Sequence, residues 1–171
     1  MAEFDPVSTL RVLVRLRVDF VVIGGIAARL RGAPLLTQDV DVTPASDPEN
    51  MRRLAAALED LEARLRTATE PEGAPFPFDP RLLETATVWT LTTKFGDLDL
   101  AVSPAGTHGY DDLIRDAESL TVALEPRLEV MVASLSDVIR SKEAAGREKD
   151  RAALPLLRRT LEELGPDQSR S

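Results

Sequence analysis

Two pairs of aspartates have the residue type and spacing to hold metal ions. Asp39 and Asp41 are two positions apart in an alternating run, and Asp97 and Asp99 repeat this spacing in a second run. Side chains two apart on a β-strand share one face. If the two strands are neighbours, the four carboxylates converge and provide the hard oxygen ligands that Mg²⁺ prefers. The alternative is a solvated sheet face with no ligand.

A glycine pair precedes the first aspartate pair. Gly24 and Gly25 separate an apolar run that predicts a buried strand from a segment that predicts a helix. Glycine allows positive φ and close backbone approach, and a helix that starts there offers free N–H groups to a phosphate. The alternative is a turn that needs glycine only for packing. Thr37 has the same parity as Asp39 and could add a hydroxyl.

Charged residues near the C-terminus could complete a phosphate site. Lys142 offers a point charge to phosphate oxygens, and Arg147 offers a bidentate guanidinium. Asp150 could orient either cation or cap the last helix. The alternative is an ordinary set of solvated charges at helix ends.

The composition narrows the function classes. The chain has 171 residues, no cysteine, one histidine and a net charge of -8. Disulfides, cysteine nucleophiles and thiolate metal sites are excluded, and a histidine-based triad or zinc site has almost no residues to use. No run is apolar and long enough for a membrane span, and the N-terminus lacks a signal pattern, so we expect no membrane association and a cytoplasmic location.

Helical and strand patterns alternate irregularly along the chain. They predict an α/β (mixed α+β) fold in which helices flank a mixed β-sheet, with a helical C-terminal piece. A helix capped by Asp47 carries an apolar stripe through Leu65, and the segment 69–80 is expected to be a loop. Runs 87–93 and 97–102 predict a hairpin. The last helix, 150–164, is expected to bend or restart near Pro155.

The glycine pair, thirteen further residues and Asp39-Val40-Asp41 together resemble the signature of the DNA polymerase β-type nucleotidyltransferase superfamily, including its AbiE-type bacterial toxins. The resemblance implies the nucleotidyltransferase fold, with Asp39 and Asp41 as ligands of Mg²⁺. Asp99 then supplies the third carboxylate, with Asp97 as second choice. Gly25 stands where many catalytic members carry serine.

The run from Lys142 to Leu154 is similar to a further motif of the toxin-like branch, in which a Lys, an Arg and an Asp face the nucleotide. By this resemblance the nucleotide-binding set comprises Gly24, Gly25, Thr37, Lys142, Arg147 and Asp150. Residues 1–105 are expected to form the nucleotidyltransferase core, 106–164 an extension packed on it, and 165–171 a flexible tail.

The resemblance implies transfer of a nucleoside monophosphate from an NTP to an acceptor hydroxyl by a two-metal mechanism. The acceptor would be tRNA or a small molecule, and a partner would be a cognate antitoxin or a second copy of the chain. A tRNA acceptor needs a concentrated basic surface, for which the available residues are Arg11, Arg15, Arg17, Arg29, Arg31 and the cluster 140–151. The alternatives are an inactive nucleotide-binding or interaction module of the same fold, and a structural protein with a solvated acidic sheet.

Overall fold

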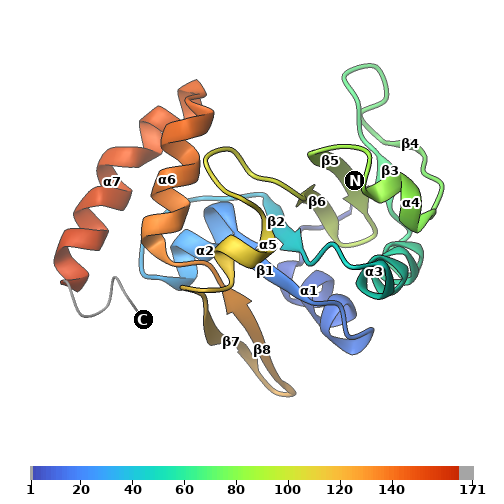
Figure 1. Cartoon of the computed structure of the whole chain (residues 1–171), viewed down its shortest axis with the longest axis horizontal. Helices are drawn as coiled ribbons and strands as arrows, with labels where there is room; N and C mark the ends of the chain where they lie inside the picture. Colours follow the sequence, from blue (N-terminus) through green and yellow to red (C-terminus); the bar gives the residue numbers. More distant parts are fainter. Residues whose placement is uncertain (1, 166–171) are drawn as a thin grey trace.

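The computed structural model describes residues 2–165, which form one mixed eight-stranded sheet covered by helices (Figure 1). In chain order the strands are β1 (Phe20–Ile23), β2 (Asp39–Pro44), β3 (Arg64–Leu65), β4 (Ala74–Pro75), β5 (Val88–Thr93), β6 (Gly96–Ala101), β7 (Glu118–Leu124) and β8 (Arg127–Val132). The helices in this range are α1 (Pro6–Arg15), α2 (Gly24–Leu30), α3 (Pro48–Asp60), α4 (Pro80–Leu83), α5 (Tyr110–Leu113), α6 (Leu135–Ala145) and α7 (Glu148–Leu164). The predicted α/β class with a mixed sheet is confirmed.

The strand order is β4-β3-β5-β6-β2-β1-β8-β7. The central strand β2 is antiparallel to β1 and parallel to β6. The predicted hairpin is present, because β5 and β6 pair antiparallel from Val88↔Ala101 to Thr93↔Gly96. This topology makes the two aspartate-bearing strands, β2 and β6, direct neighbours.

The alternation of side chains on β2 and β6 divides the sheet into an apolar and an acidic side. Val40, Val42, Leu98 and Leu100 are fully buried in the hydrophobic core. Helices α1 and α3 contact each other and β2, and they supply apolar stripes to this core. The carboxylates on the same strands must therefore point to the opposite side.

The helix cap predicted at Asp47 is present in the structure. The Asp47 carboxylate accepts a hydrogen bond from the backbone N–H of Asn50 at the start of α3. Ser134 caps α6 by accepting from the N–H of Asp137, and Gly146 ends that helix at a φ of 61°. The short turn at Gly146 brings α7 back along α6, and this pair of helices stands beside α2 (Figure 1).

Three predicted details are wrong. The helix that begins after Asp47 ends at Asp60, and Leu65 lies in β3. The segment 69–80 contains the short strand β4, which pairs with β3. Helix α7 does not restart at Pro155, because it is continuous from Glu148 to Leu164. In each case contacts distant in sequence outweigh the local pattern.

Residues 106–164 contribute both to the sheet and to the helices beside it. Strand β8 pairs parallel to β1, and the N–H of Ala133 donates to the carbonyl of Val22 at 2.9 Å. Of the predicted tail 165–171, all but Gly165 lies outside the described residues. Among the helices of residues 2–165, none has the length and apolar character that a bilayer span requires.

Candidate active site

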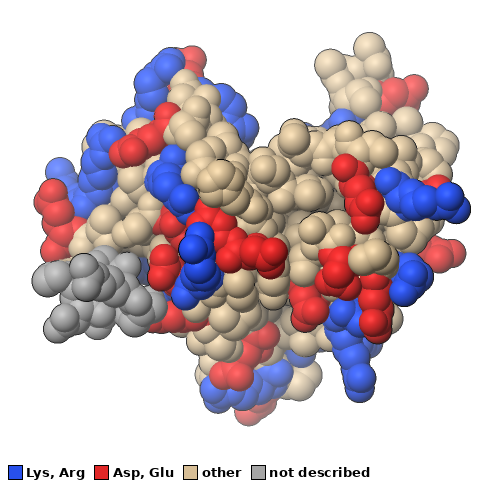
Figure 2. All heavy atoms as spheres, viewed as in Figure 1, with Lys and Arg blue, Asp and Glu red and all other residues tan. Residues whose placement is uncertain are grey.

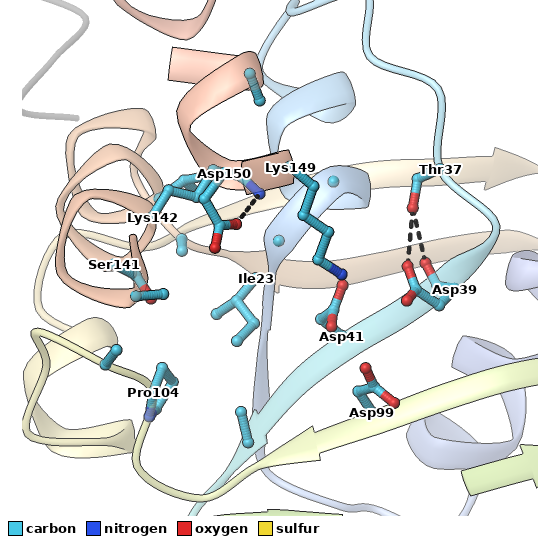
Figure 3. A pocket seen from close by; sticks show the side chains of 18 of the residues that line it. Ile23, Thr37, Asp39, Asp41, Asp99, Pro104, Ser141, Lys142, Lys149 and Asp150 are labelled. Carbon is cyan, nitrogen blue, oxygen red and sulfur yellow. Dashed lines mark hydrogen bonds and ion pairs between the residues drawn. The ribbon is translucent and has the colours of Figure 1, made fainter. Parts of the chain in front are cut away.

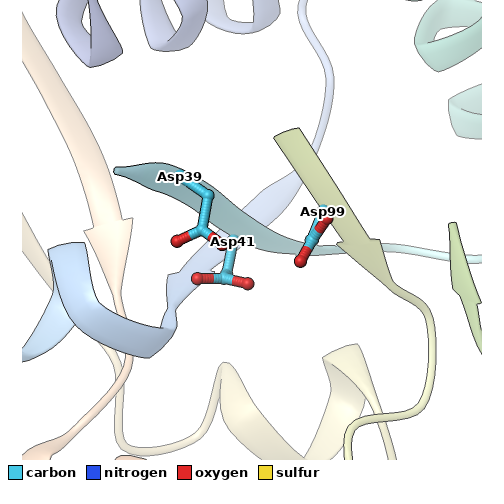
Figure 4. A group of neighbouring side chains, drawn as sticks. All are labelled: Asp39, Asp41 and Asp99. Atoms are coloured by element: carbon cyan, nitrogen blue, oxygen red, sulfur yellow. The ribbon is translucent and has the colours of Figure 1, made fainter. Parts of the chain in front are cut away.

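Three of the predicted carboxylates meet on the acidic side of the sheet. Parallel pairing of β2 with β6 puts Asp41 opposite Asp99, and Asp39 opposite Asp97. Asp39, Asp41 and Asp99 each offer an oxygen atom, and these three oxygens lie within 4.8 Å of one another (Figure 4). Asp97, the second choice, is not in this group among the described residues, and its Oδ2 lies 3.5 Å from Arg66 Nη1.

The negative charge of the carboxylate cluster is only partly compensated by nearby cations. Burial raises the pKa of Asp41 to about 7, with further contributions from Asp39 and Asp99, although Lys142 and Lys149 oppose the shift. Burial and Asp39 also raise the pKa of Asp99. Negative charge is therefore costly here, and a bound cation would relieve the repulsion.

One carboxylate oxygen of Asp99, Oδ1, is buried without a hydrogen-bond partner among the described residues. The nearest cation is Arg66, whose Nη2 lies 3.9 Å away, beyond hydrogen-bond distance. A buried carboxylate oxygen of this kind normally has a donor or a metal as partner. The candidate metal ligands of this cluster are all carboxylate oxygens, which suit Mg²⁺ better than softer metals.

The glycine pair packs directly against the acidic strand. Gly24 begins α2 at a φ of 66°, and a Cβ on it would overlap the carboxylate of Asp41. A Cβ on Gly25 would lie 2.9 Å from both Cβ and Oγ1 of Thr37. Both glycines are therefore required by close approach, the first to a predicted metal ligand and the second to Thr37.

Thr37 occupies the space beside Gly25. Its Oγ1 lies 3.1 Å from the backbone oxygen and from Oδ1 of Asp39, to which its hydroxyl donates. A serine at position 25 would need the space that Thr37 fills. The chain thus places a hydroxyl beside the carboxylate cluster from the loop before β2.

A cavity of about 430 Å³ opens between the carboxylates and the α6–α7 pair (Figure 3). Its volume lies within the range of small-molecule sites in proteins. The predicted site residues that line it are Gly24, Gly25, Thr37, Asp39, Asp41, Asp99, Lys142, Arg147 and Asp150. The structure therefore brings all nine first-choice residues to a single cavity.

Within that cavity, Lys142 and Arg147 both contact the side chain of Asp150. The Asp150 side chain has no exposed surface, and its Oδ1 lies 3.4 Å from Lys142 Nζ. Its Oδ2 accepts from Arg147 Nε at 2.7 Å and from the Arg147 backbone N–H at 3.3 Å. Asp150 therefore both orients the two cations and caps α7. We call Lys142, Arg147 and Asp150 the α6–α7 clamp.

The sequence analysis missed two cations at the site. Lys149, in the first turn of α7, points toward Asp41 (Figure 3). Its position next to Asp150 in the motif run was a usable signal. Arg66 follows β3 and reaches Asp97 and Asp99. It could not be placed from sequence, because its strand was predicted to be the end of a helix.

On one side of the cavity, strands β2 and β6 present three carboxylates beside the Thr37 hydroxyl. On the other side, the α6–α7 pair and the turn between them carry three cations, Lys142, Arg147 and Lys149. This arrangement can hold a divalent cation on one side of the cavity and an anionic group on the other. No protein-family model matches the chain, and no curated protein sequence gives a match.

Proposed function

We propose that this protein is a Mg²⁺-dependent nucleotidyltransferase that moves a nucleoside monophosphate from an NTP to an acceptor hydroxyl and releases pyrophosphate. The observation that carries the proposal is the convergence of Asp39, Asp41 and Asp99 on the wall of a cavity that also has cationic residues. Catalysis at such a site rests on positioning and charge neutralisation.

The carboxylates would hold the metal ions. Asp39, Asp41 and Asp99 would be their ligands, in keeping with the raised pKa of Asp41 and with Oδ1 of Asp99, which accepts no hydrogen bond from the described residues. Bound Mg²⁺ would neutralise phosphate charge and lower the pKa of the attacking hydroxyl. Thr37 would fix the rotamer of Asp39 through its hydrogen bond.

The chain's own groups would carry the proton and the leaving group. Asp99 would accept the proton of the acceptor hydroxyl at a carboxylate oxygen as the acceptor oxygen bonds to the α-phosphorus. The bond from that phosphorus to the bridging oxygen of the β-phosphate breaks, and the electron pair leaves with pyrophosphate. The cationic wall of α6 and α7 would stabilise the charge on this leaving group.

The surface charge supports a small acceptor more than a tRNA. Figure 2 shows basic residues over α6 and α7 interleaved with acidic ones, on a chain of net charge -8. Several candidate arginines are held by carboxylates of the protein: Arg15 by Asp60, Arg31 by Glu118, and Arg140 by Asp112 and Asp137. Phosphate-backbone binding relies on cations that can meet phosphates, so these pairs weaken that interpretation.

Label transfer tests the proposal. Purified protein is incubated with Mg²⁺ and each NTP, labelled either at the α- or at the γ-phosphate, with total cell RNA or with the small-molecule fraction of a lysate. We expect the α-label to move to an acceptor, the γ-label to appear in pyrophosphate, and EDTA to abolish both. Mg²⁺-dependent NTP binding without any transfer would favour the inactive-module alternative.

A further inference from the structure

We propose that Lys149 is the residue that binds the phosphate groups of the substrate, whereas the α6–α7 clamp is a structural element. This inference rests on the proposed function and identifies which of the cations on the cavity wall meets the triphosphate. It differs from the prediction by resemblance, which gave that role to Lys142 and Arg147.

The clamp cations are already engaged. Arg147 directs Nε to Asp150 at 2.7 Å and Nη2 to the same carboxylate at 3.3 Å. Lys142 is mostly buried, with 18% of its side chain exposed, and Nζ faces Asp150 at 3.4 Å. Moving either cation to a phosphate would leave the fully buried Asp150 carboxylate short of a partner, which is strongly destabilising. These charges are therefore held in place by the fold.

Lys149, by contrast, is not paired with a carboxylate among the described residues. It lies at an exposed position of α7 and lines the cavity, and among the described residues its ammonium group makes no hydrogen bond or ion pair within 4.0 Å. Its neighbour Asp150 fixes the first turn of α7, so the backbone of Lys149 is held while the side chain reaches over the cavity (Figure 3). It can turn to a ligand without breaking a contact.

The charge of Lys149 acts on the carboxylates from across the cavity. Its positive charge opposes the upward pKa shifts of both Asp41 and Asp99. Before a ligand binds, Lys149 therefore partly offsets their repulsion and disfavours a cation bound alone. When a metal-bound triphosphate enters, the carboxylates face the metal and Lys149 faces phosphate oxygens. Its removal must then act in opposite directions on the two kinds of ligand.

Binding to the full-length protein tests this inference. Lys149→Gln is compared with Lys149→Arg and with Arg159→Gln, which removes the same charge from an exposed position further along α7. Calorimetry gives the Kd of Mg²⁺ alone and of inorganic tripolyphosphate or ATP in the presence of Mg²⁺. For Lys149→Gln we expect the tripolyphosphate and ATP Kd to rise about tenfold, and the Kd of Mg²⁺ alone to fall about threefold.

The controls separate this inference from the proposed function. Lys149→Arg and Arg159→Gln should stay within about twofold of wild type for the phosphate ligands. Wild-type affinity for ATP and tripolyphosphate in Lys149→Gln overturns the role of Lys149 and leaves the proposed function standing. If wild type binds no NTP with Mg²⁺, both proposals are overturned. A parallel weakening of Mg²⁺ and phosphate binding in Lys149→Gln would indicate a structural role and also overturn the inference.

Discussion

Asp41 on β2 and Asp150 on α7 line the same cavity, but they lie in opposite electrostatic environments. Burial raises the pKa of Asp41 to about 7, and two more carboxylates add to this shift. Burial also acts upward on Asp150, but the hydrogen bond and charge of Arg147 and the charge of Lys142 outweigh it, so its pKa is lowered. Among residues 2–165 no donor makes a hydrogen bond to the Asp41 carboxylate, whereas Asp150 accepts from both Lys142 and Arg147.

The difference separates a binding carboxylate from a structural one. Asp150 has its partners within the protein, so its negative charge stabilises the turn between α6 and α7. Asp41 faces like charges, so its ionisation opposes folding unless a cation arrives from solution. Residue type alone would have grouped the two together. The partners of each carboxylate distinguish them.

The largest expected effect is the loss of transfer in Asp41→Asn. Removing a metal ligand should lower the transfer rate by about 10³-fold or more and abolish Mg²⁺ binding by calorimetry. Because the substitution removes a repulsive charge, the free energy of unfolding should be unchanged or higher. Asp111→Asn, at an exposed position outside the cavity, is the matched control and should behave as wild type. Full transfer activity in Asp41→Asn would contradict the assignment.

Asp150→Asn, in contrast to Asp41→Asn, should lower the free energy of unfolding. Asparagine can still accept from the Arg147 N–H, but it leaves the mostly buried Lys142 without a carboxylate. The free energy of unfolding in urea should fall by about 3 kcal/mol. Glu143→Gln breaks an exposed pair with Arg158 on the same two helices and should change it by less than about 0.5 kcal/mol. Equal stability of the two variants would show that the clamp is not structural.

The third effect is a pH dependence of stability that follows from the raised pKa of Asp41. Between pH 4 and 7, folded Asp41 retains a proton that the unfolded chain has lost, so stability falls as the pH rises through this window. A shift of this size corresponds to about 4 kcal/mol, and water and salt around the cluster reduce it to about 2 kcal/mol. In EDTA, wild type should lose that much stability relative to Asp41→Asn between pH 4 and 7.

Urea unfolding of both proteins at several pH values in this window measures the difference. Mg²⁺ added at pH 7.5 should restore stability to wild type and leave Asp41→Asn unchanged, because ligand binding to the folded state stabilises it. A stability difference that does not vary with pH would contradict the raised pKa of Asp41.

The positions of the cluster carboxylates on their strands could be predicted from sequence, because strand alternation is a local pattern. Period-two alternation placed Asp39 and Asp41 on one face of their strand. The predicted hairpin placed Asp99 on its second strand, β6. The neighbour relation between β2 and β6 came from the family resemblance. The cap at Asp47 was also predictable, since a helix cap depends on one or two residues.

The parts that sequence analysis missed depend on distant contacts. Leu65 continues the helical spacing of Leu58 and Leu61, but Glu62 takes a φ of 53° and the chain leaves the helix to pair with β4 and β5. Because the sequence analysis did not predict the turn at Glu62, it also did not place Arg66 near the carboxylates. Pro155 does not end α7, because Leu154 and Leu157 on either side of it are buried and compensate for one lost backbone hydrogen bond.

The smallest expected effect lies within the carboxylate cluster itself. Asp39 is the member that accepts a hydroxyl hydrogen bond, from Thr37. Thr37→Val keeps the shape and removes a bond worth about 1 kcal/mol, so Mg²⁺ should bind about fivefold more weakly. Thr37→Ser should bind as wild type, and Thr121→Val, on the exposed face of β7, controls for loss of a hydroxyl elsewhere. Unchanged Mg²⁺ affinity in Thr37→Val would mean that β2 alone orients Asp39, and that Thr37 faces the cavity only to fill the space beside Gly25.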